Sequence, residues 1–184
     1  MMRIITGKAK GIRLATLEGE ATRPTSERTK EAVFSMLQFD IEGRRVLDLF
    51  AGSGQMGIEA LSRGAEKAVF VDQSPVSIDH INRNLKNTEL TDKAKVIRGD
   101  YTAVLLGMTE KFDYVFLDPP YASGFLEKAL KLVQKNVKEH GIIICEHPKE
   151  VVLLDEVDEF TVKKQYRYGK VYITFYTRKG ALDE

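Results

Sequence analysis

The fold of this 184-residue chain is decided by Val46-Leu47-Asp48-Leu49-Phe50-Ala51-Gly52-Ser53-Gly54-Gln55-Met56-Gly57. An apolar run enters a glycine-rich turn, after which apolar residues recur with helical spacing at Ile58, Ala60 and Leu61. The G-x-G-x-x-G pattern lets the backbone turn tightly and approach a ligand closely. The stretch therefore predicts the first strand, turn and helix of a nucleotide-binding α/β sheet.

Acidic residues beside this turn restrict the kind of nucleotide. Asp72 follows Gly52 by twenty positions, which is the spacing of a ribose-binding acid in dinucleotide folds. Asp48, however, ends the strand where a pyrophosphate would have to lie, and a carboxylate repels that group. It suits the α-ammonium of a methionine moiety instead. We therefore expect S-adenosylmethionine, with its amino-acid tail near Asp48 and its ribose near Asp72.

A second motif, Asp118-Pro119-Pro120-Tyr121, follows the apolar run 114–117. Two prolines cannot continue a sheet, so the chain must leave the strand directly after Asp118. A carboxylate, a proline carbonyl and a flat ring then converge, which suits a planar heterocycle with an exocyclic amine. A simple turn with Asp118 as a helix cap is the alternative, and the glycine turn upstream favours the functional interpretation. We expect Asp118, Pro119 and Tyr121 to be catalytic, and Asp118 also to face the cofactor.

Carboxylates end four predicted strands, because Asp100 follows 95–99 in the same way. In open α/β sheets ligands bind at the carboxyl ends of the strands, so the four acids favour one site. Asp100 can equally cap the helix that begins at Tyr101.

Strands are expected near 46–50, 67–72, 95–99, 112–117 and 141–146, and helices near 54–63, 75–87, 101–107 and 123–138. This alternation predicts a doubly wound, mainly parallel sheet, and the β-rich runs 160–167 and 170–177 predict a C-terminal antiparallel hairpin.

The first forty residues are expected to form a basic extension to a domain spanning 41–184. Runs at 3–6 and 12–15 predict a small hairpin, and a helix is expected from Thr25 or Ser26 with an apolar face of Val33, Met36 and Leu37. Residues 1–30 hold seven basic and three acidic groups, which favours contact with a polyanion over a merely solvated surface. If the arm serves only this contact, a protein lacking residues 1–14 should still fold.

Composition excludes several other classes. The net charge of +1 argues against a wholly basic nucleic-acid coat, and a single cysteine excludes an intramolecular disulfide. Three histidines without ligand spacing argue against a metal site. No apolar run is long enough to cross a membrane or to form a signal peptide, so a cytoplasmic protein is expected.

The chain resembles the bacterial 16S rRNA guanine-N2 methyltransferase family. The matching segments are Arg3-Ile4-Ile5-x-Gly7-Lys8, Arg23-Pro24-Thr25, Leu47 to Gly54, Glu59-Ala60-Leu61-Ser62-Arg63-Gly64-Ala65, Phe116 to Tyr121 and Tyr168-Gly169. The resemblance implies a seven-stranded S-adenosylmethionine-dependent methyltransferase fold. It also implies a guanine-N2 acceptor in the small ribosomal subunit or its assembly intermediate, and we expect a monomer. The expected cofactor residues are Asp48, Phe50, Gly52, Gly54, Asp72, Gln73, Asp100, Tyr101 and Asp118, and the expected RNA contacts are Arg3, Lys8, Lys10, Arg13 and Arg23.

Three alternatives remain open at the level of sequence. Adenine-N6 methyltransferases of DNA or RNA use the same D-P-P-Y chemistry. A protein glutamine methyltransferase would more often carry Asn in place of Asp118. A non-catalytic RNA-binding protein with a nucleotide fold would keep the pocket without methyl transfer.

Overall fold

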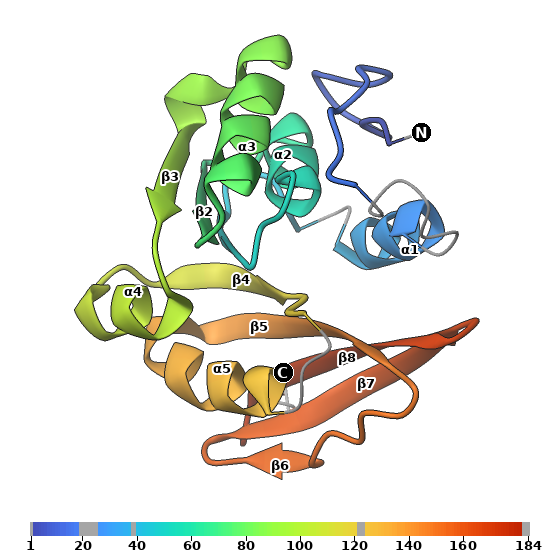
Figure 1. The fold of residues 1–184 in the computed structure, drawn as a ribbon. Coiled ribbons are helices and arrows are strands. Elements are labelled where there is room, and N and C mark those ends of the chain that lie inside the picture. The colour runs from blue at the N-terminus through green and yellow to red at the C-terminus, as the bar shows by residue number, and fades with distance from the viewer. Residues whose placement is uncertain (1, 19–25, 38–39, 121–123, 182–184) are drawn as a thin grey trace.

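The computed structural model describes residues 2–18, 26–37, 40–120 and 124–181. Strands and helices alternate from Arg45 to Pro148, as the sequence predicted, and β strands follow to Arg178 (Figure 1). The helices are α1 (Ser26–Leu37), α2 (Gln55–Ser62), α3 (Pro75–Asn87), α4 (Tyr101–Gly107) and α5 (Phe125–Val133), with short 3-10 turns at Thr91–Lys93 and Gln134–Asn136. The strands are β1 (Arg45–Leu49), β2 (Lys67–Asp72), β3 (Ala94–Arg98), β4 (Phe112–Leu117), β5 (Val137–Pro148), β6 (Glu156–Val157), β7 (Phe160–Tyr168) and β8 (Val171–Arg178).

One sheet contains the eight strands in the order β3-β2-β1-β4-β5-β8-β7-β6. The first five strands in this order, from β3 to β5, are parallel to one another. β8 pairs antiparallel with β5, β7 with β8, and β6 with β7. The chain winds outward from β1 to β3 and then returns to place β4 on the other side of β1. The carboxyl ends of β1 and β4 therefore form the switch point at which open α/β sheets bind ligands.

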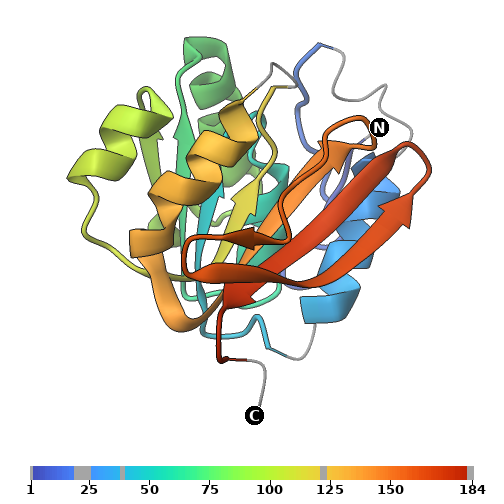
Figure 2. The same ribbon diagram turned by 90° about the horizontal axis from the view of Figure 1, so that it is seen from below.

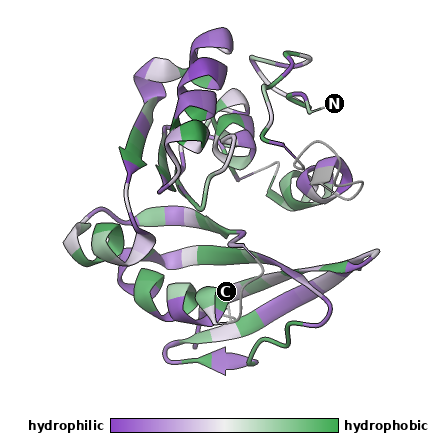
Figure 3. Cartoon of the chain, viewed as in Figure 1, coloured by the Kyte–Doolittle hydropathy of each residue, from purple (hydrophilic) through white to green (hydrophobic). Residues whose placement is uncertain are grey.

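Helices cover both faces of the sheet (Figure 2). α1, α2 and α3 pack on one face around Phe34, Ile58 and Phe70, and α4 and α5 pack on the other around Leu105 and Val115. Figure 3 shows hydrophobic colour along much of the central strands, while the exposed turns of α3 are hydrophilic. The sheet is therefore buried on both faces, as parallel sheets require. This confirms the predicted class I methyltransferase fold, with one strand more than the expected seven.

Three predicted details were wrong. The helix expected to reach residue 138 ends at Val133, and β5 begins at Val137, because Val137 pairs with Phe112 at the edge of the core. The eighth strand, β6, consists of two residues and had no periodicity to reveal it. On α1, Val33 and Leu37 are buried as predicted, but Phe34 is fully buried whereas Met36 is 38% exposed, so the apolar face includes Phe34 in place of Met36.

The N-terminal segment is a hairpin-like loop held by the isolated antiparallel bridge between Arg3 and Arg13. Its apolar side chains Met2, Ile4 and Leu14 are buried in the same core as Phe34. A Cβ at Gly7 would lie 1.9 Å from the Ser62 carbonyl oxygen, so the loop touches the end of α2 directly. The boundary at residue 40 thus separates segments of one packed core, and the first fourteen residues contribute to the fold.

In the described ranges, all five α helices are too short or too polar to cross a lipid bilayer.

Candidate active site

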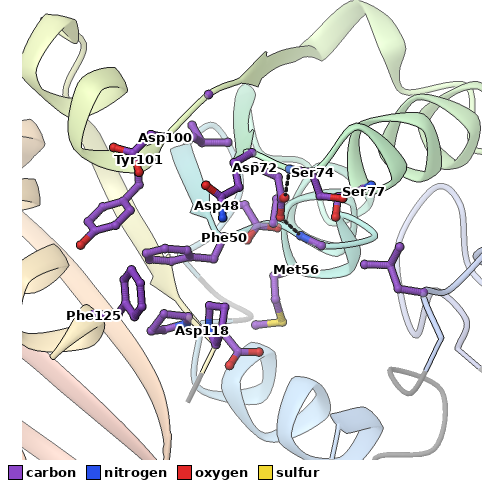
Figure 4. Close-up of a pocket in the computed structure, with 18 of the residues that line it drawn as sticks. Asp48, Phe50, Met56, Asp72, Ser74, Ser77, Asp100, Tyr101, Asp118 and Phe125 are labelled. Carbon is purple, nitrogen blue, oxygen red and sulfur yellow. Dashed lines mark hydrogen bonds between the residues drawn. The ribbon is translucent and has the colours of Figure 1, made fainter. Parts of the chain in front are cut away.

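A cavity of about 520 Å³ opens at the switch point, between the carboxyl ends of β1 and β4 (Figure 4). The glycine turn after β1, the end of β2, the start of α4 and the turn after β4 all line it. The predicted residues that reach it are Asp48, Phe50, Gly52, Asp72, Gln73, Asp100, Tyr101, Asp118 and Pro119. Residues from four strand ends thus converge because parallel strands present their carboxyl ends at one edge.

Asp48 is held inside the glycine turn. Its carboxylate is 4% exposed and accepts the backbone N–H of Gly57 at 3.0 Å, at the start of α2. A helix N-terminus stabilises a negative charge, so burial and charge are compatible here. The Asp48 carboxylate is therefore held in a fixed position at the wall of the cavity.

Two of the glycines have close packing contacts. A Cβ at Gly57 would lie 2.3 Å from the Phe70 ring, so only glycine lets α2 approach β2 this closely. Gly54 adopts a left-handed φ of 80° and packs against Ile58 and Ile81. Gly54 is not among the residues that line the cavity, and its predicted contact with the cofactor stays a prediction.

Asp72 links the glycine turn to the next helix. One carboxylate oxygen accepts the Gly52 N–H at 2.9 Å, and the other accepts the Ser74 N–H at 2.9 Å (Figure 4). These bonds fix the orientation of the carboxylate at the cavity wall. Each oxygen keeps a further lone pair, so Asp72 can still accept hydrogen bonds from a ribose diol.

Aromatic rings form one wall of the cavity (Figure 4). The Phe50 ring lies 4.8 Å from the Tyr101 ring, which lies 6.1 Å from Phe125. Phe50 has a φ of 65°, a left-handed conformation that is unusual for a bulky residue and often occurs at functional sites. The planes of neighbouring rings are inclined by 51° and 61°, so the wall offers apolar ring faces and edges to a purine rather than one flat plane.

Asp100 both caps a helix and lies at the cavity, the two positions that the sequence allowed for it. It caps α4 by accepting the N–H groups of Thr102 and Ala103, and it lies at the cavity edge. The hydrogen bond from the Thr102 hydroxyl lowers the pKa of the Asp100 carboxyl. It is therefore ionised at neutral pH.

The cavity is strongly acidic. Its described lining holds five carboxylates, from Glu18, Asp48, Asp72, Asp100 and Asp118, and no lysine, arginine or histidine. A pyrophosphate would be repelled from such a site, whereas a ligand with sulfonium and ammonium groups is attracted. The residues therefore fit S-adenosylmethionine and argue against a dinucleotide.

The Asp118-Pro119-Pro120 turn leaves β4 at the cavity, as predicted. Asp118 is half-buried and Pro119 is buried, so the turn presents a carboxylate and a rigid backbone. Tyr121 lies outside the described residues, and so does Arg23. The stacking role of Tyr121 and the RNA contact of Arg23 stay predictions from the sequence.

The other expected RNA contacts lie away from the cavity. The Lys8 N–H donates to the Ser62 carbonyl at the last residue of α2, whereas the first residues of that helix line the cavity. Arg3 lies 3.5 Å from the exposed carboxylate of Glu27. Lys8, Lys10 and Arg13 are exposed or half-exposed, so their contact with RNA stays a prediction.

Some lining residues could not be predicted. Leu17 and Glu18 reach the cavity from the N-terminal segment, and Phe125 reaches it from the start of α5. Leu17 and Glu18 lie in a polar loop without a motif. Phe125 belongs to an ordinary amphipathic pattern, in which nothing distinguishes a lining residue from a core residue.

Comparisons with known proteins identify the family of this chain. The family model described as "Conserved hypothetical protein 95" matches residues 2–177. YlbH of Bacillus subtilis, provisionally named an rRNA methyltransferase, is 40% identical over 97% of this chain and 100% of its own. The ribosomal RNA small subunit methyltransferase D of Haemophilus influenzae is 34% identical over 95% of this chain and 93% of its own. The solved structure of Escherichia coli yhhF, provisionally described as a methyltransferase, superposes with a TM-score of 0.86 at 30% identity, covering 96% of this chain and 97% of its own. Given this match over nearly the whole length and the acidic cavity at the switch point, the chain belongs to the Conserved hypothetical protein 95 family of S-adenosylmethionine-dependent rRNA methyltransferases.

Proposed function

We propose that this protein transfers the methyl group of S-adenosylmethionine to the exocyclic N2 amine of a guanine in 16S rRNA, within the small ribosomal subunit or its assembly intermediate. The observation that carries the proposal is the meeting of the five-carboxylate cavity with the Asp118-Pro119 turn. The five carboxylates suit a cationic methyl donor, and the Asp118-Pro119 turn suits an aromatic amine.

The cofactor, when bound, supplies an activated methyl group on its positive sulfonium. Asp48 attracts the ammonium of the methionine tail, and Asp72 accepts hydrogen bonds from the ribose. The Phe50–Tyr101 wall packs against the adenine, with Asp100 at its edge. The carboxylates of Asp48, Asp72 and Asp100 are already oriented by hydrogen bonds from backbone N–H groups, so little reorganisation is needed at the moment of transfer.

On the acceptor side, the guanine amine is a poor nucleophile because its lone pair is delocalised into the ring. The Asp118 carboxylate and the Pro119 carbonyl accept its two N–H hydrogens, which favours a pyramidal nitrogen and points the lone pair at the methyl group. The bond from nitrogen to methyl would form as the bond from sulfur to methyl breaks, S-adenosylhomocysteine would leave, and one N2 proton would pass to Asp118 or to solvent. Tyr121 stacks on the base once it has left its helix, which contributes on the order of 1–3 kcal/mol. Positioning of this kind, without covalent help from the protein, can supply much of the rate enhancement.

Two measurements test this function. Calorimetry compares S-adenosylmethionine with NAD on the purified protein, and only the former is expected to bind. Labelled methyl transfer is then measured to three acceptors: small subunits from cells lacking the gene, free 16S rRNA, and DNA. Label in the ribosomal RNA alone supports the proposal, whereas label in DNA supports the adenine-N6 alternative. Cofactor binding without transfer to any acceptor would favour the non-catalytic alternative.

A further inference from the structure

The β7–β8 hairpin projects at the same edge of the sheet as the cavity. β8 begins at Val171, which pairs with Pro148 at the end of β5, so Tyr168, Gly169 and Lys170 extend beyond the ends of the parallel strands. Figure 1 shows the tip reaching past the ends of β4 and β5. The tip therefore lies where a macromolecule docked over the cavity would meet it.

Three cations gather at this tip. Lys149, Arg167 and Lys170, here called the tip cluster, are all exposed. The Lys149 N–H donates to the Lys170 carbonyl at 3.1 Å, and the Arg167 side chain donates to the Gly169 carbonyl at 3.0 Å, so the three lie together. Among the described residues none of them has a carboxylate within ion-pair distance.

The opposite end of the hairpin is different. There Arg178 pairs with Glu159, and Lys179 pairs with Glu156. From Phe160 to Leu182 the sequence contains no acid, so the tip is left positive while the base of the hairpin is neutralised. Figure 3 shows the part of β7 toward the tip as hydrophilic.

Protection of an exposed sheet edge explains part of this charge but not the tip cluster. β6 pairs with Phe160 and Thr161, and the Val162 N–H donates to the Asp155 carbonyl. Among the described residues β7 is an open edge beyond Val162, where Lys163 and Lys164 discourage pairing with another chain. Lys149 and Lys170 are not in β7, and so they protect no such edge.

Flat side chains connect the tip to the catalytic turn. Tyr172 stacks on His147 with ring centroids 5.8 Å apart and planes inclined by 17°, and Arg167 is the cross-strand neighbour of Tyr172. His147 lines a second cavity of about 260 Å³, whose wall includes Pro119 and Pro120. Burial lowers the pKa of His147, so its ring is neutral at pH 7. Pro120, which is exposed, and the tip cluster thus lie at the two ends of the surface over the His147–Tyr172 pair, of which His147 itself is buried.

We infer that this surface holds the RNA strand next to the modified guanine. The tip cluster binds backbone phosphates, and Tyr172 and Arg167 offer flat groups beside which a flanking base can stack. The inference rests on the proposed function, since it assumes that the acceptor is RNA. It assigns to the C-terminal hairpin a role that the basic N-terminal arm was expected to fill alone.

The test uses the full chain with Lys149→Gln, Arg167→Gln and Lys170→Gln combined. The matched control combines Arg83→Gln, Lys86→Gln and Lys93→Gln, which removes the same charge from exposed residues on α3 and the following 3-10 turn, near the amino end of β3. Binding to small subunits from cells lacking the gene is measured at several salt concentrations with S-adenosylhomocysteine present. Melting temperature and S-adenosylmethionine affinity are measured on all three proteins.

The tip variant should flatten the log–log salt slope by roughly two to three units, because each lost phosphate contact removes about 0.7–0.9. The control variant should keep the wild-type slope, and all three proteins should fold and bind S-adenosylmethionine alike. A tip variant with the wild-type slope would overturn the inference while leaving the proposed function intact, provided that the wild type methylates rRNA. If the wild type binds subunits through the tip but methylates no rRNA, the proposed function fails and the RNA-binding surface stands. If the wild type neither binds nor methylates subunits, both are overturned.

Discussion

Replacing Glu59 by Gln is expected to lower the free energy of unfolding by about 3–5 kcal/mol, the usual cost of leaving a buried charge without its partner. Glu59 lies on α2 and is fully buried. It accepts the backbone N–H groups of Ile5 and Thr6 at 2.9 and 3.1 Å, and its carboxylate lies 3.4 Å from Lys30 and 2.9 Å from Arg63. Gln has the same shape but carries no charge, so the loss reports electrostatics rather than a cavity.

The effect should be large because Lys30 cannot reach solvent. Its side chain is fully buried, and desolvation already lowers its pKa even with Glu59 beside it. At about 2–4 °C per kcal/mol for a protein of this size, the melting temperature should fall by roughly 6–20 °C.

Calorimetric or urea unfolding of Glu59→Gln, Lys30→Met and the double variant measures this directly. The double variant should lose clearly less than the sum of the single variants, because Lys30→Met removes the stranded cation. A melting temperature within 2 °C of wild type for Glu59→Gln, or strict additivity, would refute the reasoning. Because Ile5 and Thr6 belong to the same network, we expect deletion of residues 1–14 to lower the stability, so neutral replacements are the better probe of that arm.

Four further outcomes are expected. Asp118→Ala should bind S-adenosylmethionine within a few-fold of wild type by calorimetry yet lose most methyl transfer, and normal turnover would disprove the in-line amine model. Asp72→Ala should weaken cofactor binding by about 1.5–3 kcal/mol through loss of charge-assisted hydrogen bonds, and unchanged affinity would remove Asp72 from the ribose site. Gly57→Ala should lower both the melting temperature and cofactor affinity, because its Cβ would lie 2.3 Å from Phe70; wild-type values would show that α2 can move without cost. Hydrogen bonding to Lys95 and Lys67 lowers the pKa of Glu110 below 4.5. Its stabilisation is therefore present above that pH and lost as pH falls through the lowered value, so the stability of Glu110→Gln should fall less steeply in acid, and parallel acid-unfolding curves would contradict this.

Local sequence signals predicted much of the site. An apolar run that ends at or close to an Asp indicates both where the strand stops and which side chain meets the sheet edge. The sequence therefore predicts that Asp48, Asp72, Asp100 and Asp118 lie together, because parallel strands share one carboxyl edge, and all four line the cavity.

Features that depend on distant contacts could not be predicted. Glu59 binds amides more than fifty positions away, and on a helical pattern it looks like an ordinary surface acid. β5 starts early only because Val137 meets Phe112, and a Cβ at Gly141 would lie 2.9 Å from the Phe112 carbonyl oxygen. The short strand β6 forms because β7 offers it a partner. In each case the deciding contact is between segments with no common motif.

The nucleoside that receives the methyl group tests the central claim most directly. Small subunits from cells lacking the gene are incubated with the protein and labelled S-adenosylmethionine, and the RNA is digested to nucleosides and analysed by mass spectrometry. The account predicts label in N2-methylguanosine from 16S rRNA, and little label with Asp118→Ala. Label in N6-methyladenosine, or in a nucleoside methylated at a ring carbon or ribose, would contradict it.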